Sequence, residues 1–257
     1  MKLAAVQYRP PKGRPEAARI DLRLLIDEAA AKGAQLVVLP EMATTGYVWE
    51  GPNELGPLTE PAHGPTAGIL SAAARAHGLW IVCGYPERYL HPGRTGPNGR
   101  PLASLFNSAL VVNPEGELVT SYRKVLLYEL DKSWATAGWR RVVVPSPLGR
   151  MVPGICMDLN DDEFIAFVHS AEAKLLPFCT NWLLEPGAEL HRYWADRLDG
   201  WDGWMVAANT WGQDRGTRFA GRSAILGPGG VVVAEAPAEG DAVLVYDTAR
   251  WSAGKQR

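Results

Sequence analysis

The sequence predicts a single α/β domain, built as a four-layer α-β-β-α sandwich and spanning residues 1–257. Short apolar runs with strand character alternate with stretches that carry apolar residues at helical spacing, and no linker separates two units. The order of these segments, roughly β-α-β-α-β-β-β, occurs twice along the chain. A mixed sheet system with helices on its outside accommodates this order most simply.

The first half of the chain supplies the first set of expected elements. Apolar runs predict strands at 2–8, 35–39, 79–84, 106–112 and 118–124. Helical spacing predicts helices over 14–32 and 66–77, which end before Gly33 and Gly78. The segment 35–39 is almost continuously apolar, as expected for a strand that is covered on both faces. The segment 91–101 is rich in Gly and Pro, and we expect it to be an exposed loop.

The second half repeats this order. We expect strands at 141–144, 151–156, 174–178 and 204–209, two strands on either side of 227–230, and a last one at 242–246. Helices are expected over 162–171 and 187–198. Residues 251–257 form a short polar tail, which we expect to be ordered only by a partner subunit.

The composition excludes several classes of function. The net charge is -2, so no basic excess points to nucleic acid, and no run approaches the roughly 18 apolar residues of a membrane span. Three cysteines, Cys83, Cys156 and Cys179, are too few for a disulfide framework and fit a reducing cytoplasm. No Cys-x-x-Cys occurs and the five histidines are scattered, so we expect no metal site.

Three residues with complementary chemistry each end a predicted strand: Glu41, Lys124 and Cys156. A thiolate is a strong nucleophile, but a thiol near neutral pH needs a base or a nearby cation. Glu41 can take the proton if it is partly desolvated, and Lys124 and the N–H of Met157 can stabilise a tetrahedral intermediate. Taken singly, each has a plainer interpretation: a packed core thiol, a polar strand end, and a surface lysine paired with Glu129 or Asp131.

Three segments together resemble the catalytic motifs of the nitrilase superfamily of carbon–nitrogen hydrolases. They are LPEMATTGY at 39–47, YRKVLLY at 122–128 and GICMDL at 154–159, and they occur in the family's order and spacing. Further similar segments are LAAVQ at 3–7 and TNW at 180–182. The resemblance covers essentially the whole chain.

This resemblance implies an α-β-β-α sandwich of the nitrilase type with a Glu41–Lys124–Cys156 triad and with no metal or cofactor. It also implies a homodimer or a larger homo-oligomer. Many relatives carry a second glutamate shortly after the lysine, and here Asp131 or Glu129 stands near that position. The implied reaction is hydrolysis of a linear, non-peptide amide bond through a thioester, with release of ammonia.

The form of the third motif resembles the branch that contains N-terminal asparagine amidases, so a peptide N-terminus is one expected substrate. Asp158 and the acidic residues at 161–163 suggest a mouth that binds an α-ammonium group, although helix capping explains the same residues. We also expect Tyr47, Asn181 and Trp182 to line the pocket. Alternatives are an ω-amidase acting on dicarboxylate monoamides, a nitrilase, a catalytically silent binding subunit and a thiol-redox protein.

Overall fold

The computed structural model describes residues 1–96 and 99–251. The strands of the first sheet are β1 (Lys2–Gln7), β2 (Leu36–Val38), β3 (Trp80–Thr95), β4 (Pro101–Val112), β5 (Leu118–Arg123) and β13 (Ala242–Asp247). Those of the second are β6 (Gly154–Ile155), β7 (Leu175–Thr180), β8 (Trp204–Asn209), β11 (Ala224–Gly227) and β12 (Val231–Glu235), and β9 (Trp211–Asp214) and β10 (Thr217–Ala220) form a separate hairpin.

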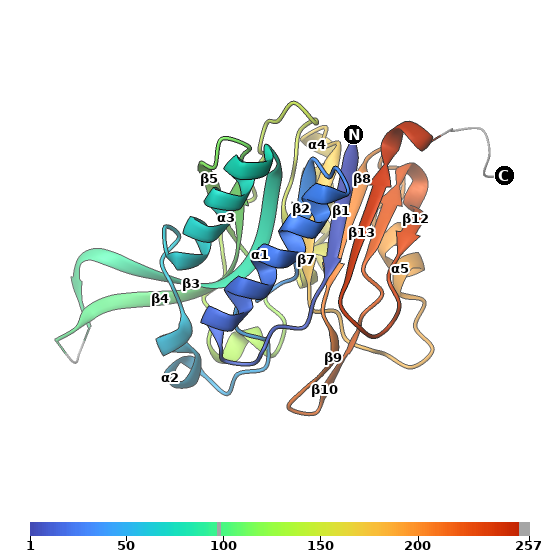
Figure 1. Ribbon diagram of the computed structural model, residues 1–257. Coiled ribbons are helices and arrows are strands. Elements are labelled where there is room, and N and C mark those ends of the chain that lie inside the picture. Colours follow the sequence, from blue (N-terminus) through green and yellow to red (C-terminus); the bar gives the residue numbers. More distant parts are fainter. Residues whose placement is uncertain (97–98, 252–257) are drawn as a thin grey trace.

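The helices lie outside the sheets (Figure 1). They are α1 (Pro15–Ala31), α2 (Pro52–Leu55), α3 (Pro65–His77), α4 (Asp162–Ser170) and α5 (Leu190–Arg197). Short 3-10 turns occur at η1 (Gly56–Leu58), η2 (Asp131–Ser133), η3 (Cys156–Asn160), η4 (Pro228–Gly230) and η5 (Thr248–Arg250). Prolines occupy the first turns of α1 and α3, where a missing N–H costs nothing, and Gly78 ends α3 in the left-handed conformation.

Three apolar layers hold the four structural layers together. Leu22 and Ile26 of α1 pack with Val6 and Ile81 on the outer face of the first sheet. Leu3, Val38 and Val82 of the first sheet meet Leu175 and Val206 of the second in the central layer. Phe164 of α4 and Trp194 of α5 pack on Phe178 and Met205 at the other outer face. The predicted α-β-β-α sandwich is therefore confirmed.

The sheet orders show how the two halves repeat. The first sheet runs β13-β1-β2-β3-β4-β5 and the second runs β12-β11-β8-β7-β6. In each half, parallel pairs joined through a helix are followed by antiparallel pairs, as the predicted order requires. The last strand, β13, crosses to the first sheet and pairs antiparallel with β1.

Three sequence predictions about the elements were wrong. The segment 91–101 is exposed but is no simple loop, because β3 and β4 stay paired out to Thr95 and Pro101 and extend away from the body (Figure 1). Ladder hydrogen bonds need no apolar side chains, so composition did not reveal this arm. The strand at 141–144 is reduced to a bridge between Val144 and Met151, and β6 is shorter than the predicted 151–156.

The hairpin of β9 and β10 was missed. Its turn holds Arg215 and Gly216 at φ 46° and 86°, the left-handed pair that a tight hairpin turn requires. Asp214 in this hairpin accepts hydrogen bonds from the Tyr47 and Val48 N–H groups, at 3.2 Å and 2.9 Å. The hairpin therefore fixes the loop that follows Glu41.

The predicted tail at 251–257 begins at the edge of the described chain. The rings of Trp251 and Trp204 lie 5.6 Å apart, so the first residue of the tail packs against the body. Residues 252–257 lie outside the described residues.

Candidate active site

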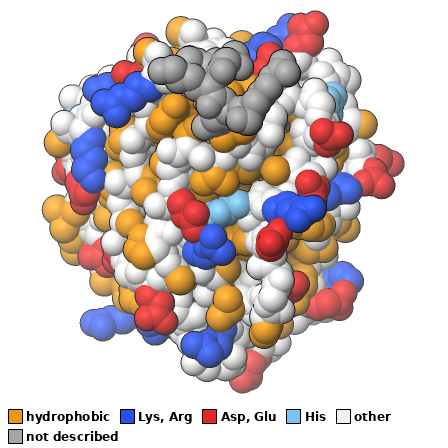
Figure 2. Space-filling model, turned by 90° about the vertical axis from the view of Figure 1, so that its right-hand side faces the viewer, with side chains coloured by type: hydrophobic (Ala, Val, Ile, Leu, Met, Phe, Trp, Pro, Cys, Tyr) orange, Lys and Arg blue, Asp and Glu red, His pale blue; other side chains and the backbone are white. Residues whose placement is uncertain are grey.

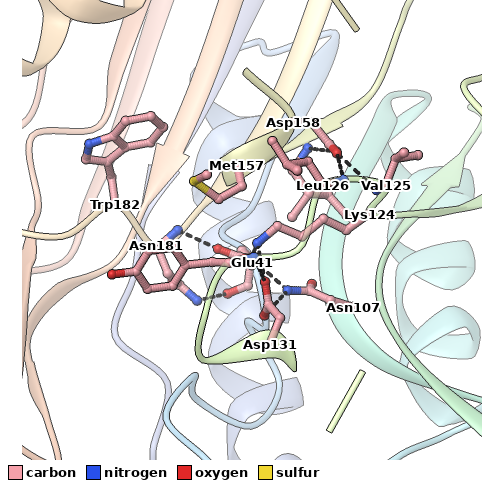
Figure 3. A network of polar contacts seen from close by, with 12 residues as sticks. Glu41, Asn107, Lys124, Val125, Leu126, Asp131, Met157, Asp158, Asn181 and Trp182 are labelled. Carbon is pink, nitrogen blue, oxygen red and sulfur yellow. Dashed lines mark hydrogen bonds and ion pairs between the residues drawn. The ribbon is translucent and has the colours of Figure 1, made fainter. Parts of the chain in front are cut away.

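The three chemically distinct residues predicted at strand ends come together between the sheets. Glu41 follows β2 and Lys124 follows β5 in the first sheet, whereas Cys156 follows β6 in the second. All three are buried, with Glu41 1%, Lys124 0% and Cys156 7% exposed. Figure 3 shows the polar network in which Glu41 and Lys124 take part.

Lys124 lies between two carboxylates. Its Nζ is 2.7 Å from Glu41 Oε1 and 2.6 Å from Asp131 Oδ2, and Asp131 is fully buried (Figure 3). Glu129, the other residue considered for the fourth position, lies on the surface and pairs with Lys132. The structure therefore brings Asp131 to the lysine and leaves Glu129 outside the site.

Asn107, which the sequence analysis did not single out, joins the two carboxylates. Its Nδ2 donates to Glu41 Oε1 at 2.7 Å and to Asp131 Oδ1 at 3.0 Å (Figure 3). The backbone oxygen of Asn107 also accepts from the Lys124 N–H at 2.9 Å. A polar amide within the otherwise apolar run at 106–112 was the available signal, because a buried amide requires partners.

Asn181 holds the other side of Glu41. Its backbone N–H donates to Glu41 Oε2 at 2.8 Å, and its Nδ2 donates to the Glu41 carbonyl at 3.0 Å (Figure 3). Gly84 permits this tight arrangement, since a Cβ at that position would lie 2.5 Å from the Glu41 Cα. Both oxygens of the Glu41 carboxylate are thus fixed by hydrogen bonds.

Cys156 stands on a strained turn. Its φ is 42°, in the left-handed region that is costly for a residue with a side chain, and it separates the short strand β6 from η3. Such strain is characteristic of strand-to-helix turns that present a nucleophile. The N–H groups at the start of a helical turn have no partner within the turn, and Met157 occupies this position.

Asp158 does not bind substrate as predicted, because it is fully buried and does not line the cavity beside Cys156. It accepts hydrogen bonds from the Tyr122 hydroxyl at 2.7 Å and from the N–H groups of Val125, Leu126 and Ile155 at 3.0 Å each. These contacts tie the segment after Lys124 to the turn that carries Cys156.

The neighbouring acidic residues do not form the predicted mouth either. Asp161 caps α4 by accepting from the Glu163 N–H, as the capping interpretation required. Arg141 pairs with both Asp161 and Glu163, and Arg197 pairs with Asp162 at 2.7 Å. Arginines therefore neutralise this cluster.

The electrostatics of the site favour a resting thiol, which gives up its proton during attack, over a preformed thiolate. Burial, reinforced by the charge of Glu41, raises the pKa of the Cys156 thiol to about 12. Burial also raises the pKa of Glu41, with Lys124 opposing the rise. Burial alone would lower the pKa of Lys124, but the charges of Asp131 and Glu41 hold it well above its ordinary value. The resting site thus pairs a protonated thiol with a carboxylate of raised basicity and a permanent cation.

A cavity of about 220 Å³ opens beside Cys156. It is lined by Tyr47, Tyr128, Cys156, Met157, Asn160, Asn181, Trp182, Leu183 and Glu185. The predicted pocket residues Tyr47, Asn181 and Trp182 are among them. Among the described residues that line this cavity there is no lysine or arginine. The Tyr47 hydroxyl is buried and has no hydrogen-bond partner in the described chain, so it is available to a bound molecule.

Within residues 1–96 and 99–251, no group of three or more His, Cys, Asp or Glu side chains is arranged to hold a metal ion. The same part of the chain contains no helix that is long and apolar enough to cross a membrane. The three cysteines are unpaired and buried.

Comparison with known proteins identifies the class. The carbon–nitrogen hydrolase family matches residues 2–257, and the chain belongs to that family. It is 27% identical to the protein N-terminal amidase of Schizosaccharomyces pombe, over 88% of this chain and 91% of that protein. It is 31% identical to a nitrilase of Pyrococcus abyssi, over 89% of this chain and 82% of the relative.

The fold has solved counterparts. The amidase from Nesterenkonia sp. AN1 superposes with a TM-score of 0.80 at 23% identity, covering 96% of this chain and 92% of the amidase. That structure carries an acrylamide adduct at its active-site cysteine. Family and fold together make this protein a carbon–nitrogen hydrolase with amidases among its relatives.

Proposed function

We propose that Glu41, Lys124 and Cys156 hydrolyse the side-chain amide of an N-terminal asparagine or glutamine. The observation that carries this choice of substrate is the cavity beside Cys156, whose described lining offers no cation. An ω-amidase must hold the free carboxylate of a dicarboxylate monoamide, and a pocket whose described lining has no cation does not compensate that charge. The similarity to the N-terminal amidase of Schizosaccharomyces pombe supports the same choice.

The proposed reaction has two halves. Cys156 Sγ attacks the amide carbon while its proton passes to Glu41, and Lys124 Nζ and the Met157 N–H stabilise the oxyanion. The C–N bond then breaks as Glu41 returns the proton to the leaving nitrogen, which gives ammonia and a thioester. Glu41 next takes a proton from water, the resulting hydroxide attacks the thioester, and the thiol leaves with the acid as product. Asp131 and Asn107 position Lys124 and Glu41 throughout.

A nitrilase activity is the second candidate, favoured by the 31% identity to the Pyrococcus abyssi protein. The same thiol attacks a nitrile carbon, and two waters convert the resulting thioimidate to acid and ammonia. The buried, hydrogen-bonded Glu41 can serve either reaction.

Ammonia release from a substrate panel tests the proposal. The panel contains peptides that begin with Asn or Gln, succinamate, α-ketoglutaramate and one aliphatic nitrile. We expect turnover of the peptides, at a kcat/KM at least tenfold above that of the other compounds. Faster turnover of the monoamides would make the protein an ω-amidase, and faster turnover of the nitrile would make it a nitrilase. No ammonia from any compound would point to a silent binding subunit.

The pH dependence follows from the raised pKa of Glu41. Glu41 must be ionised to accept the thiol proton, so kcat/KM for a neutral amide falls as the pH drops through its pKa. Burial raises that pKa above 4.5, its ordinary value for a glutamate. The fall of kcat/KM on the acid side is therefore expected above pH 4.5. Because burial raises the pKa of the thiol to about 12, the rate is expected to be level from the end of this acid-side fall up to pH 9. A rate that rises tenfold per pH unit across that range would instead show that a preformed thiolate is required.

We also propose that the protein forms a homodimer or a larger assembly in the cytoplasm. Figure 2 shows a face over α5 and β12 on which apolar side chains reach the surface between isolated charges of both signs. Trp139, elsewhere on the surface, is 74% exposed. Exposed apolar area of this kind is common at subunit contacts, and three unpaired thiols suit a reducing compartment. Light scattering of the purified protein measures the assembly directly.

A further inference from the structure

One carboxylate stands at the rim of the Cys156 cavity. Glu185 is exposed and lines the cavity together with neutral side chains, among them Tyr47, Asn160 and Trp182. Its carboxylate makes no hydrogen bond or ion pair with another described residue. Two other exposed carboxylates do have partners, since Glu163 pairs with Arg141 and Glu189 with Arg192. Glu185 thus leaves an uncompensated negative charge at the entrance.

The fold holds the backbone before Glu185 in place. Leu183 forms a bridge with Phe219 of β10, and the Leu184 N–H donates to the Arg218 carbonyl at 2.9 Å. The Glu185 carbonyl accepts from the Ala188 N–H at 3.1 Å. The missed hairpin of β9 and β10 therefore fixes the rim as well as the loop after Glu41.

We propose that Glu185 is a specificity-determining residue that binds a substrate ammonium group close to the amide, an inference that rests on the proposed function. In an N-terminal asparagine, two carbon atoms separate the amide carbon from the ammonium nitrogen, a reach of roughly 4 Å. In glutamine the separation is one methylene longer. A cavity of about 220 Å³ has room for a side chain of this length.

The same charge also explains selectivity. A carboxylate accepting a hydrogen bond from an ammonium group makes a charge-assisted contact, which at an exposed carboxylate such as Glu185 strengthens binding by up to about fivefold. A substrate carboxylate in the ammonium position meets repulsion from Glu185 and finds no cation in the described lining. Glu185 thus takes over the role that the sequence assigned to the acidic residues at 158–163.

Two matched substrates and two variants test this role. The substrates are Asn-Gly-Gly and its des-amino analogue, 3-carbamoylpropanoyl-Gly-Gly, both as C-terminal N-methylamides. The wild type is expected to favour the first by about twofold to fivefold in kcat/KM. Glu185→Gln, which keeps the shape of the side chain, should remove this preference by slowing only the ammonium substrate. Glu189→Gln, on the same loop outside the cavity, should keep it.

The outcomes separate this inference from the proposed function. If the wild type shows no preference, or if Glu185→Gln slows both substrates equally, Glu185 does not recognise an ammonium group, although peptide deamidation stands. If neither peptide is hydrolysed, peptide deamidation fails, and the comparison moves to 3-aminopropanamide and butanamide, which have the same length. If the wild type prefers 3-aminopropanamide, which carries the ammonium group, and Glu185→Gln abolishes this preference, the ammonium site is supported. If the wild type hydrolyses both compounds at equal rates, the inference fails.

Discussion

Cys156→Ala is expected to reduce ammonia release by about 10⁴-fold or more, because removal of the attacking atom disables the thioester route as a whole. The fold should survive, because the change removes a single sulfur atom from a side chain that is 7% exposed. Thermal unfolding should therefore stay within a few degrees of the wild type. Steady-state ammonia release and a melting curve measure the two effects separately.

The other cysteines provide the matched controls. Cys83 and Cys179 are fully buried, and burial raises the pKa of the Cys179 thiol well above its ordinary value. Cys83→Ala and Cys179→Ala are expected to cost stability but to keep kcat within severalfold. Ammonia release that survives in Cys156→Ala would remove the proposed nucleophile. Loss of ammonia release in a folded Cys179→Ala variant would instead show that the hydrolysis depends on Cys179.

Strand periodicity made most of the fold predictable, and strand ends made the core of the site predictable. Glu41 and Cys156 follow parallel strands that are covered on both faces, so their side chains emerge at defined places. Lys124 follows β5, an antiparallel strand of mixed apolar and polar residues that is only partly buried. Because the two sheets face each other, polar residues at these ends meet once the apolar layers close.

Residues inside turns and loops were beyond that reasoning. Asp158 is two residues after Cys156, and sequence distance did not reveal that its carboxylate turns inward to four donors while Asp161 and Glu163 face Arg141. Glu185 lies in a loop without periodicity, and its position depends on a hairpin that was not predicted. Local order in such segments comes from contacts between distant parts of the chain, which a pattern in one segment does not encode.

The network around Lys124 explains why its parts are interdependent. The lysine, Glu41 and Asp131 are all buried, and burial of separate charges would cost several kcal/mol for each ion. Mutual attraction offsets this cost only while the hydrogen bonds of Asn107 and Asn181 satisfy the remaining oxygens. The site is therefore stable as a set and sensitive to the loss of any single charge.

Lys124→Met is expected to be the most damaging single change to stability. It leaves Glu41 and Asp131 buried beside each other without a cation, which costs about 3–5 kcal/mol. For a chain of this size that loss corresponds to a fall of roughly 10 °C in Tm. Lys132→Met is the control, because Lys132 pairs with Glu129 on the surface and such pairs contribute at most about 1 kcal/mol.

The cause of this loss can be separated from simple cavity formation by two further measurements. Burial raises the pKa of Glu41, and the charge of Lys124 opposes this rise. Removal of Lys124 therefore raises the pKa of Glu41 further. The folded variant then binds a proton more readily than the unfolded chain does. The loss in free energy of unfolding relative to the wild type should therefore be smaller at pH 5 than at pH 8. Adding Asp131→Asn removes one of the two charges and should restore part of the stability while activity stays lost. A deficit that is equal at both pH values and unchanged in the double variant would mean that packing, rather than charge, explains the effect.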